Sequence, residues 1–570
     1  MPGIKPRPAN SQFNRPIEKS MKSYGLLAAI FCLLSTPNHA AESTPMVLDM
    51  VYPNPGEAEP KSQFIDPALL AKWGFNGNVP REFVQCAVTY DDFDPEVLPA
   101  GTPDRAWVEE NARKAEKRIA AMQAAGLPCY PFTDFIVLPK RMVAKYKAEI
   151  CDEKGHIDIH RPKTKEVVVA MVDGIFKRFP DLAGLTLRHG ETYLHDTPFH
   201  AGGNPILRGV ESHVELLRLL REEICVKRGK VLFYRTWDFG AMHDRPDFYL
   251  SVTDRIEPHP KLIFSIKHQL GDFHRLSKFN PCLTIGKHRQ IVEVQCQLEA
   301  YGKGSFPYYN GQGVIDGWEE YVGRNGPQGL RDIVSNPLFA GVWTWSRGGG
   351  WKGPYIPNEF WVEMNTYVIA KWAQNPQRTE EQLFDEFARE IAGIQDQQNL
   401  ERLRRIALLS AKAVLRSQNS LIHKLDVWWN RDHYFADLSK ELEPLANSGK
   451  ADEFLREKAE ATRMWREIES LSRELSVPDA KTEEFIRVSC TYGRIKAAII
   501  EQMCRAMVFS HQGKSKDRRV ADAIGEYDGL WDEWRRLLAD HPASCATLYT
   551  DKAFGEKPGM GAAIDKLRAK

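Results

Sequence analysis

A chain of 570 residues is longer than one hydrophobic core usually supports, so we expect two domains. Its 77 Lys and Arg residues balance 76 Asp and Glu residues, which leaves a formal net charge of +1. This balance excludes the strongly basic surface that nucleic-acid-binding proteins use, so we expect a small partner that is uncharged or only locally charged.

The first 41 residues are predicted to be an N-terminal extension followed by an export signal. Lys22 precedes an apolar run over residues 24–35, and small residues follow at Ala40 and Ala41, as in a secretory signal peptide. The residues before Met21 are polar and Pro-rich, so we expect translation to start at Met21. The apolar run is shorter than the about 20 residues that span a membrane. We therefore predict a secreted or periplasmic protein with no membrane contact beyond export.

The cysteines outside this signal do not resemble a disulfide framework. They are odd in number and contain no CxxC pair, although export would favour disulfides. We interpret them mainly as buried thiols: Cys86, Cys129, Cys151, Cys225, Cys282, Cys296, Cys490, Cys504 and Cys545.

Residues 46–358 alternate short apolar runs with amphipathic stretches, which is the pattern of repeated βα units around a parallel sheet. Helices are predicted at residues 67–73, 105–125, 164–179 and 209–227. Eight strands joined by helices predict an α/β fold of the (β/α)8 TIM-barrel type. The predicted strands are residues 46–52, 83–89, 129–132, 184–187, 230–234, 262–266, 291–297 and 339–344.

Residues 359–570 lack strand signals and are predicted to form an all-α C-terminal domain. Long amphipathic runs dominate this part of the chain, and the final GEKPGMGAA tail is expected to be loose. The predicted helices are residues 359–373, 379–394, 399–418, 451–476, 482–512 and 520–538.

Reactive groups of such a barrel lie at the C-terminal ends of its strands, so the residues after each apolar run are the candidates for function. Arg188, His189 and Glu191 follow the fourth predicted strand. Further candidates follow the fifth and sixth strands: Arg235, Trp237, Asp238, Lys267, His268 and Asp272.

The seventh and eighth strands add a carboxylate and aromatic side chains. Alternation along strand seven puts Glu293 and Glu299 on one face, with Glu299 nearest the open end. Glu293, near the middle of the strand, is expected to pair with a base inside the barrel. Strand eight supplies Trp343 and Trp345, and aromatic walls beside convergent carboxylates are typical of a sugar site.

Cleavage of a glycosidic bond needs one carboxylic acid to protonate the leaving oxygen and one carboxylate to activate water or attack carbon. Glu191, Asp272 and Glu299 are the catalytic candidates. Their types and positions predict a glycoside hydrolase that acts on a carbohydrate substrate. The histidines match no spacing of metal ligands, so we predict no metal and no other cofactor.

Several strand-end segments resemble the α-glucuronidases that release 4-O-methylglucuronic acid from xylan. The quoted segments are FPDLAGLTLRHGE, FYRTWDF, HQLGDFHRLSKFNPCLTIG and IVEVQCQLEAYG, and a weaker likeness continues through FWVEMNTYVIAKWAQNPQRTEEQLFDEFARE. Two features depart from the family. The predicted barrel begins too early for an N-terminal β domain, and the segment between Arg188 and Glu191 is one residue shorter.

The resemblance implies a role for five of these residues. Glu191 is the general acid, Arg188 and Arg235 meet the uronate, and Asp272 with Glu299 activates water in an inverting reaction. It thus implies an exo-acting hydrolase of a terminal uronic acid or a related sugar.

Two other functions stay open from the sequence. One is a retaining barrel glycosidase that uses Glu299 as its nucleophile, and the other is a polysaccharide-binding barrel without catalysis. Two side-chain roles are also open. Arg188 is either a carboxylate-binding residue or a structural ion-pair partner, and the tryptophans either stack on sugar or pack under the helical domain.

Overall fold

The computed structural model describes residues 44–52, 61–190, 194, 196–237, 241–271, 273–297, 304–348, 356–423, 425, 437–513, 517–544, 553–554 and 557–569. Residues from Pro45 onward form one unit, and the fold below is that of this unit.

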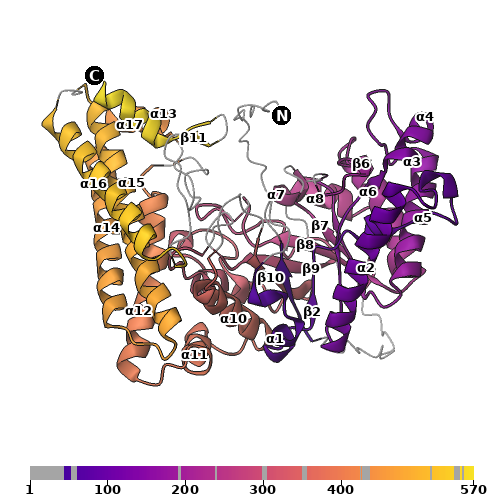
Figure 1. The fold of residues 1–570 in the computed structure, drawn as a ribbon, viewed down its shortest axis with the longest axis horizontal. Coiled ribbons are helices and arrows are strands. Elements are labelled where there is room, and N and C mark those ends of the chain that lie inside the picture. Colours follow the sequence, from indigo (N-terminus) through magenta and orange to yellow (C-terminus); the bar gives the residue numbers. More distant parts are fainter. Residues whose placement is uncertain are drawn as a thin grey trace, which may run out of the picture. The chain divides into compact units, whose positions relative to one another are not determined.

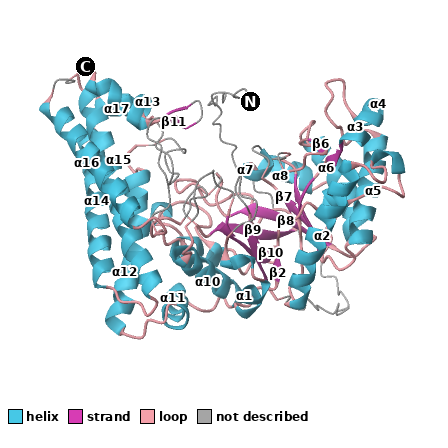
Figure 2. Cartoon of the chain, viewed as in Figure 1, coloured by secondary structure: helices cyan, strands magenta, loops and turns pink. Residues whose placement is uncertain are grey.

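Eight parallel strands form a single curled sheet with helices around it (Figures 1 and 2). Their order in the sheet is β2-β1-β10-β9-β8-β7-β5-β3. The strands are β1 (Met46–Val51), β2 (Gly77–Asn78), β3 (Phe132–Asp134), β5 (Gly184–Arg188), β7 (Val231–Arg235), β8 (Leu262–Lys267), β9 (Arg289–Gln295) and β10 (Phe339–Arg347).

The two edge strands of this sheet are linked by hydrogen bonds. Asn78 N–H donates to the Pro128 carbonyl at 2.9 Å, and Tyr130 N–H donates to the Asn78 carbonyl at 3.0 Å. The segment that leads into β3 therefore bonds to β2 as well as to β5.

Helices follow most strands and cover the outer face of the sheet. Helix α2 shows how the sequence builds this layer, because Val108, Ala112, Ala115, Ile119 and Met122 form one buried stripe at helical spacing. Pro103 begins the helix at a position where no backbone N–H is needed. The α-helices of this part are α1 (Pro67–Lys72), α2 (Pro103–Ala124), α3 (Lys140–Lys145), α4 (Lys147–Ile150), α5 (Pro162–Arg178), α6 (Val210–Leu220), α7 (Ala241–Asp244), α8 (Pro246–Thr253) and α9 (Gly311–Asp316).

Shorter elements complete this part of the chain. A two-stranded antiparallel sheet joins β4 to β6, and a π-helical stretch, η4, extends α6. Their bounds are β4 (Val137–Pro139), β6 (His200–Gly202), η1 (Gln63–Ile65), η2 (Val84–Ala87), η3 (Pro95–Val97), η4 (Arg221–Val226), η5 (Glu319–Tyr321) and η6 (Leu330–Asp332).

The predicted second strand at residues 83–89 is wrong. Val84–Ala87 within that range form the 3-10 helix η2, and the second strand is the short β2 in the sequence GFNGNVP. The run FVQCAVT is apolar because it packs between α2 and α5. A short apolar run has no periodicity that distinguishes a strand from a buried helical turn. A Cβ on Gly77 would lie 2.6 Å from Leu48 Cδ2, so the true strand needs a glycine that strand propensity disfavours.

The other seven predicted strands overlap observed ones. Parallel strands covered on both faces read as continuous apolar runs, and this is the signal that identified them. The four helices predicted among them correspond to α1, α2, α5 and α6 with small shifts at their ends.

After β10 the described chain is mainly helical. Helices α12, α14, α15 and α16 lie side by side in that order (Figure 1, orange to yellow). The bounds are α10 (Phe360–Gln374), α11 (Glu380–Glu386), η7 (Phe387–Ile391), α12 (Gln397–Gln418), α13 (Ser439–Ala446), α14 (Ala451–Glu474), α15 (Ala480–His511), α16 (Arg518–Asp540), β11 (Ala553–Phe554), β12 (Lys557–Pro558) and α17 (Met560–Arg568).

The expectation of a loose C-terminal tail is wrong in its last part. Residues 560–568 form α17, whose Met560, Ile564 and Leu567 are buried, and this helix contacts α15. The spacing of these three apolar residues is that of one helix face, which the Gly-rich start of the tail obscured.

The helical region is joined to the sheet through buried polar contacts. Asn365 on α10 donates to the Cys296 carbonyl just after β9 at 3.0 Å. Arg275, in the loop after β8, donates to the Ala411 carbonyl on α12 at 3.0 Å and forms a buried ion pair with Glu320. Loops that follow strand ends are therefore held against the helices.

Eight of the nine cysteines predicted to be buried thiols are buried and free in the structure, and Cys545 lies outside the described residues. In the part of the chain that the structure describes, no helix is both long and apolar enough to cross a membrane.

Candidate active site

The inner face of the curled sheet carries a hydrophobic cluster that is separate from the main core. Alternation along each strand sends every second side chain to this face. Two of its aromatic side chains, Tyr52 after β1 and Trp345 near the end of β10, lie toward the C-terminal ends of the strands. Its buried members are Leu48, Met50, Tyr52, Val79, Tyr130, Phe132, Phe233, Ile263, Phe273, Ile291, Ala340, Trp343 and Trp345.

Arg235 on β7 and Glu293 on β9 form a buried ion pair within this face. Two parallel bonds join them, from Nε to Oε1 at 2.8 Å and from Nη2 to Oε2 at 2.9 Å. Ser265 Oγ donates to Oε1 at 2.6 Å, and Trp345 Nε1 donates to Oε2 at 3.1 Å. Burial alone would raise the pKa of Glu293, but the charge of Arg235 and these bonds hold it below its ordinary value. The expected pairing of Glu293 with a base is confirmed.

Arg188 at the end of β5 is likewise paired with a carboxylate that the sequence interpretation missed. Its Nε and Nη2 donate to the two Asp134 oxygens at 2.5 Å each, and its Nη1 donates to the Tyr52 hydroxyl at 2.9 Å. Both members of the pair are almost fully buried. Of the two roles considered for Arg188, the structural ion pair is present.

A third cation, Lys267, lies at the end of β8 between aromatic rings. Its Nζ is 3.7 Å from the centroid of the Trp237 ring and 4.9 Å from that of Phe273, and the residue is 1 % exposed. A cation over the face of a tryptophan is stabilised by the ring's negative π surface. Lys267 and Trp237, two of the strand-end candidates, thus lie in contact.

Trp343 and Trp345 line the same face from β10. Their rings stack with centroids 5.9 Å apart and planes 16° apart, and both lie within 6 Å of the Arg235 guanidinium carbon. Trp343 is fully buried and Trp345 is 4 % exposed. They therefore pack inside the sheet rather than under the helices.

The two candidate histidines have different surroundings. His189 lies on the outer side of the sheet, where the centroids of its ring and of the His213 ring on α6 are 4.9 Å apart. Its Nε2 is hydrogen-bonded to the Arg235 carbonyl at 2.8 Å. His268 stacks on Phe273, and burial lowers the pKa of its imidazole to about 4. His268 is therefore neutral at physiological pH, whereas His189 does not share the inner face with Arg188.

The predicted catalytic residues Glu191, Asp272 and Glu299, and the candidate Asp238, lie outside the described residues. In the sequence they follow the ends of β5, β8, β9 and β7. Parallel strands end at the same edge of the sheet, so the chain enters all four segments from the edge that carries Arg188, Arg235 and Lys267.

Several residues of this edge were not predicted from the sequence. Arg81 after β2 lies 4.6 Å from the Tyr52 ring centroid and pairs with Asp196 at 2.6 Å. Asp134 and Gln295 also belong to strand ends. Tyr52 continues the inward alternation of Leu48 and Met50, so its place was available from the pattern, whereas Arg81 follows the strand that was misplaced.

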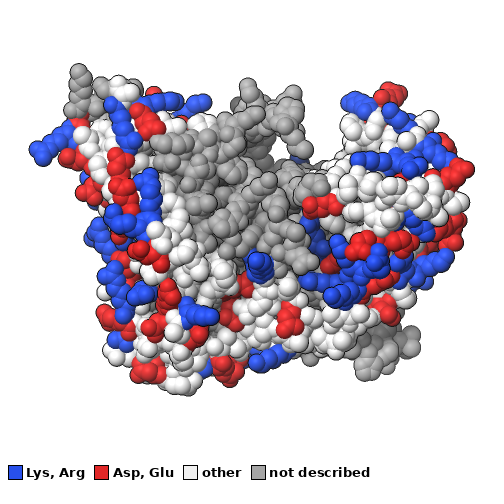
Figure 3. Space-filling model, viewed as in Figure 1, with Lys and Arg blue, Asp and Glu red and all other residues white. Residues whose placement is uncertain are grey.

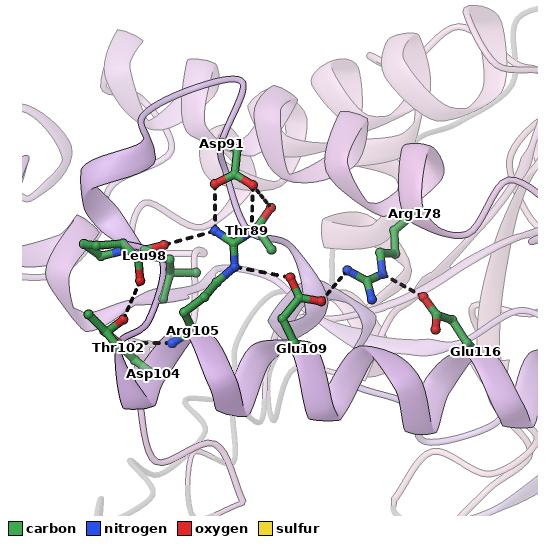
Figure 4. A network of polar contacts seen from close by, with 10 residues as sticks. Thr89, Asp91, Leu98, Thr102, Asp104, Arg105, Glu109, Glu116 and Arg178 are labelled. Atoms are coloured by element: carbon green, nitrogen blue, oxygen red, sulfur yellow. Dashed lines mark hydrogen bonds and ion pairs between the residues drawn. The ribbon is translucent and has the colours of Figure 1, made fainter.

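A separate cavity of about 1030 Å³ lies in the helical layer between α2 and α5. Its charged lining is held in a chain of ion pairs in which Arg105 binds Asp91 and Glu109, and Arg178 binds Glu109 and Glu116 (Figure 4). Because these charges bond to one another, they tie α2 to α5. We place the candidate active site at the strand ends instead.

On the face shown in Figure 3, Lys and Arg side chains of the described residues are mixed with Asp and Glu side chains over the helices. Among the described residues, no group of three or more His, Cys, Asp or Glu side chains is placed to hold a metal ion.

No family model and no curated protein sequence matches this chain. Its structure is similar to that of a GH138 enzyme targeting pectin rhamnogalacturonan II, with a TM-score of 0.59, 11 % identity, and coverage of 92 % of this chain and 83 % of that one. A mutant of the Thermobaculum terrenum O-GlcNAc hydrolase matches with a TM-score of 0.41, 9 % identity and coverage of 92 % of each chain. The first likeness shows that the fold of the GH138 enzyme extends over most of this chain.

Proposed function

We propose that this protein is a secreted or periplasmic glycoside hydrolase that removes a terminal uronic acid, or a related sugar, from a polysaccharide or oligosaccharide. The observation that carries the proposal is the layer of buried cations and aromatic rings at one edge of the curled sheet. Lys267 lies over the Trp237 ring there, Arg235 over the Trp345 ring, and Arg188 over the Phe132 ring. Aromatic rings bind sugar faces, and the Lys267 ammonium suits a carboxylate. Arg188 and Arg235 hold this edge of the sheet in place through their ion pairs with Asp134 and Glu293.

The proposed catalytic groups are Glu191 as general acid and Asp272 with Glu299 as the groups that activate water, in an inverting reaction. All three sequence positions follow strand ends of the sheet, and barrel hydrolases carry their reactive groups at such ends. The proposed architecture is a closed (β/α)8 barrel followed by a helical domain at residues 359–570. The bonds between Asn78 and the segment 128–130 support closure, because they join the two edge strands.

The likeness to a GH138 enzyme supports a glycan substrate, because that protein targets a pectin polysaccharide and shares the fold. Fold alone does not determine chemistry, so the proposal depends on the strand-end residues. We propose a carbohydrate as the only partner, with export directed by the segment that starts at Met21.

The test is release of monosaccharide from uronate-capped oligosaccharides by the purified protein, compared with Glu191→Gln and Glu299→Gln. General acid–base groups contribute about 10²–10⁴-fold, so each variant should lose at least about 10²-fold in rate. Glu153→Gln, a change at an exposed glutamate, is the matched control and should retain full activity. Absence of activity of the wild type on every uronate substrate would overturn the proposal.

Proton NMR of the first sugar released separates the two stereochemical courses. Release of the anomer opposite to that of the substrate supports inversion. Retention would instead identify Glu299 as a nucleophile, since a retaining enzyme forms a covalent intermediate on its second carboxylate. Tight binding of glycans without turnover would favour a binding protein.

A further inference from the structure

Gln295 is the last residue of β9, and its side chain belongs to the inner face of the sheet. It lies two positions beyond Glu293 on the same face, toward the C-terminal edge. In the sheet register its neighbour on β10 is Trp345, one of the two stacked tryptophans. Gln295 therefore lies among the residues of the candidate active site, one layer above the Arg235–Glu293 pair.

Among the described residues, the oxygen of the Gln295 carboxamide has a hydrogen-bond partner and its nitrogen has none. Its Oε1 accepts the backbone N–H of Gln297 at 3.2 Å. Its Nε2 is buried, and no described residue accepts a hydrogen bond from it, although Gln295 as a whole is only 3 % exposed. Buried polar groups nearly always have a partner, because loss of water without a replacement bond is costly.

The carboxylate in the layer below and the other buried carboxamide of β9 are, by contrast, fully bonded. The Glu293 carboxylate directly below accepts bonds from Arg235, Ser265 and Trp345. Gln290, at the other end of β9, is equally buried, but its Nε2 donates to the Tyr249 hydroxyl and the Cys282 carbonyl at 3.0 Å each. Its Oε1 accepts from Thr284 N–H at 2.7 Å.

The backbone around Gln295 is held in place. Asn310 Nδ2 donates to the Gln295 carbonyl, and Asn310 is itself bonded through its N–H to Asn365 Oδ1 on α10 at 3.0 Å. Gln297 Oε1 accepts the N–H of Gly348 after β10 at 3.0 Å. The carboxamide is thus presented from a rigid strand end, and a fixed donor binds a ligand with little loss of conformational freedom.

We propose that Gln295 is a substrate-binding residue whose Nε2 donates to an acceptor oxygen of the sugar bound at the strand ends. The proposal rests on the proposed function. Two N–H groups on a fixed amide fit the hydroxyl or carboxylate oxygens of a sugar, and the stacked tryptophan beside it fits the face of the ring. A bound sugar would supply the acceptor that the described residues do not offer to this N–H group.

The experiment compares Gln295→Met with Gln290→Met, two changes of the same kind on the same strand. Kd for D-glucuronic acid is measured by calorimetry, kcat and KM are measured on uronate-capped oligosaccharides, and Tm is measured without sugar. Gln295→Met should weaken binding and raise KM at least tenfold, with a Tm equal to or above that of the wild type. Gln290→Met should lower Tm and leave Kd unchanged, because its amide bonds are structural.

Gln295→Glu is a second variant that keeps the Oε1 acceptor and replaces only the donor, and it should lose affinity to the same or a greater extent. Unchanged Kd and KM in both Gln295 variants would overturn the inference, and so would a fall in Tm that matches that of Gln290→Met. These outcomes differ from failure of the proposed function, which would appear as a wild type that neither binds nor cleaves any sugar and would overturn both.

Discussion

Arg235 and Glu293 face each other across the inside of the sheet, joined by two bonds of 2.8 and 2.9 Å although they are 58 residues apart in the chain. Each is at most 2 % exposed. The pair therefore places one positive and one negative charge in the interior directly below the candidate active site, and each buried charge is stabilised by the other.

Replacement of Glu293 by Gln should destabilise the protein strongly, because Arg235 would keep a buried charge without its counter-ion. Loss of one partner of a buried ion pair costs about 3–5 kcal/mol, which is measurable as the free energy of unfolding in urea. The double variant Arg235→Met, Glu293→Leu should recover most of this loss. Asp247→Asn, which breaks an exposed pair with Arg245, is the control and should have little effect. A Glu293→Gln variant as stable as this control would contradict the prediction.

Asp49 on β1 should make stability depend on pH. Burial raises the pKa of Asp49 from 3.8 to about 7, although Thr344 and Ser346 donate hydrogen bonds to it. Because the folded protein holds the Asp49 proton more tightly than the unfolded chain does, protonation of Asp49 stabilises the fold. This contribution to the free energy of unfolding is complete below the unfolded-state pKa of 3.8 and is lost as the pH rises through the folded-state pKa of about 7.

Asp49→Asn should remove this dependence, because an amide does not titrate. The free energy of unfolding of the wild type, relative to the variant, should fall by about 3 kcal/mol between pH 5 and pH 8. Urea unfolding of both proteins at the two pH values measures the difference. Parallel pH profiles of wild type and variant would show that Asp49 does not titrate in this range.

Lys267 should select for an anionic sugar. Its ammonium is 1 % exposed and lies over Trp237, so a carboxylate bound there would meet an almost dry positive charge. A hydrogen bond to a charged group contributes about 1.5–3 kcal/mol, so Lys267→Met should lower kcat/KM by about 10–150-fold on a uronate-capped substrate.

The control substrate for Lys267 is the same oligosaccharide with its carboxylate reduced to an alcohol. Lys267→Met should change kcat/KM on this neutral substrate much less, and Lys267→Arg should retain most of the selectivity for the anion. An equal loss on both substrates would assign Lys267 to packing rather than to recognition.

Helix α17 should contribute measurably to stability. Ile564 is fully buried on the face that contacts α15, so Ile564→Ala removes apolar contacts and leaves a cavity. Such changes cost about 2–5 kcal/mol, which should appear as a lower Tm. Lys566→Ala, two residues away on the exposed side, should leave Tm unchanged. Equal Tm values for the two variants would mean that α17 is dispensable.

Local pattern accounts for most of what could be predicted. Seven strands and the long helices were visible in the sequence because apolar runs and 3.6-residue spacing are properties of neighbouring residues. The second strand was not, because Gly77 and Asn78 have low strand propensity and are selected by their closeness to Leu48 and Tyr130. The start of α17 was missed for a similar reason, since packing on α15 stabilises a helix that begins in a Gly-rich segment.

The sequence by itself determined which residue types follow each strand, and therefore that cations and aromatic rings would gather at one edge of a parallel sheet. Only the tertiary structure decided which residues would be partners. Strand order brings Arg188 to Asp134 and Arg235 to Glu293, places His189 on the outer face, and leaves the Gln295 amide without an acceptor among the described residues. These pairings join residues far apart in the chain, so no local period encodes them, and they form only when the strands assemble in this order and register.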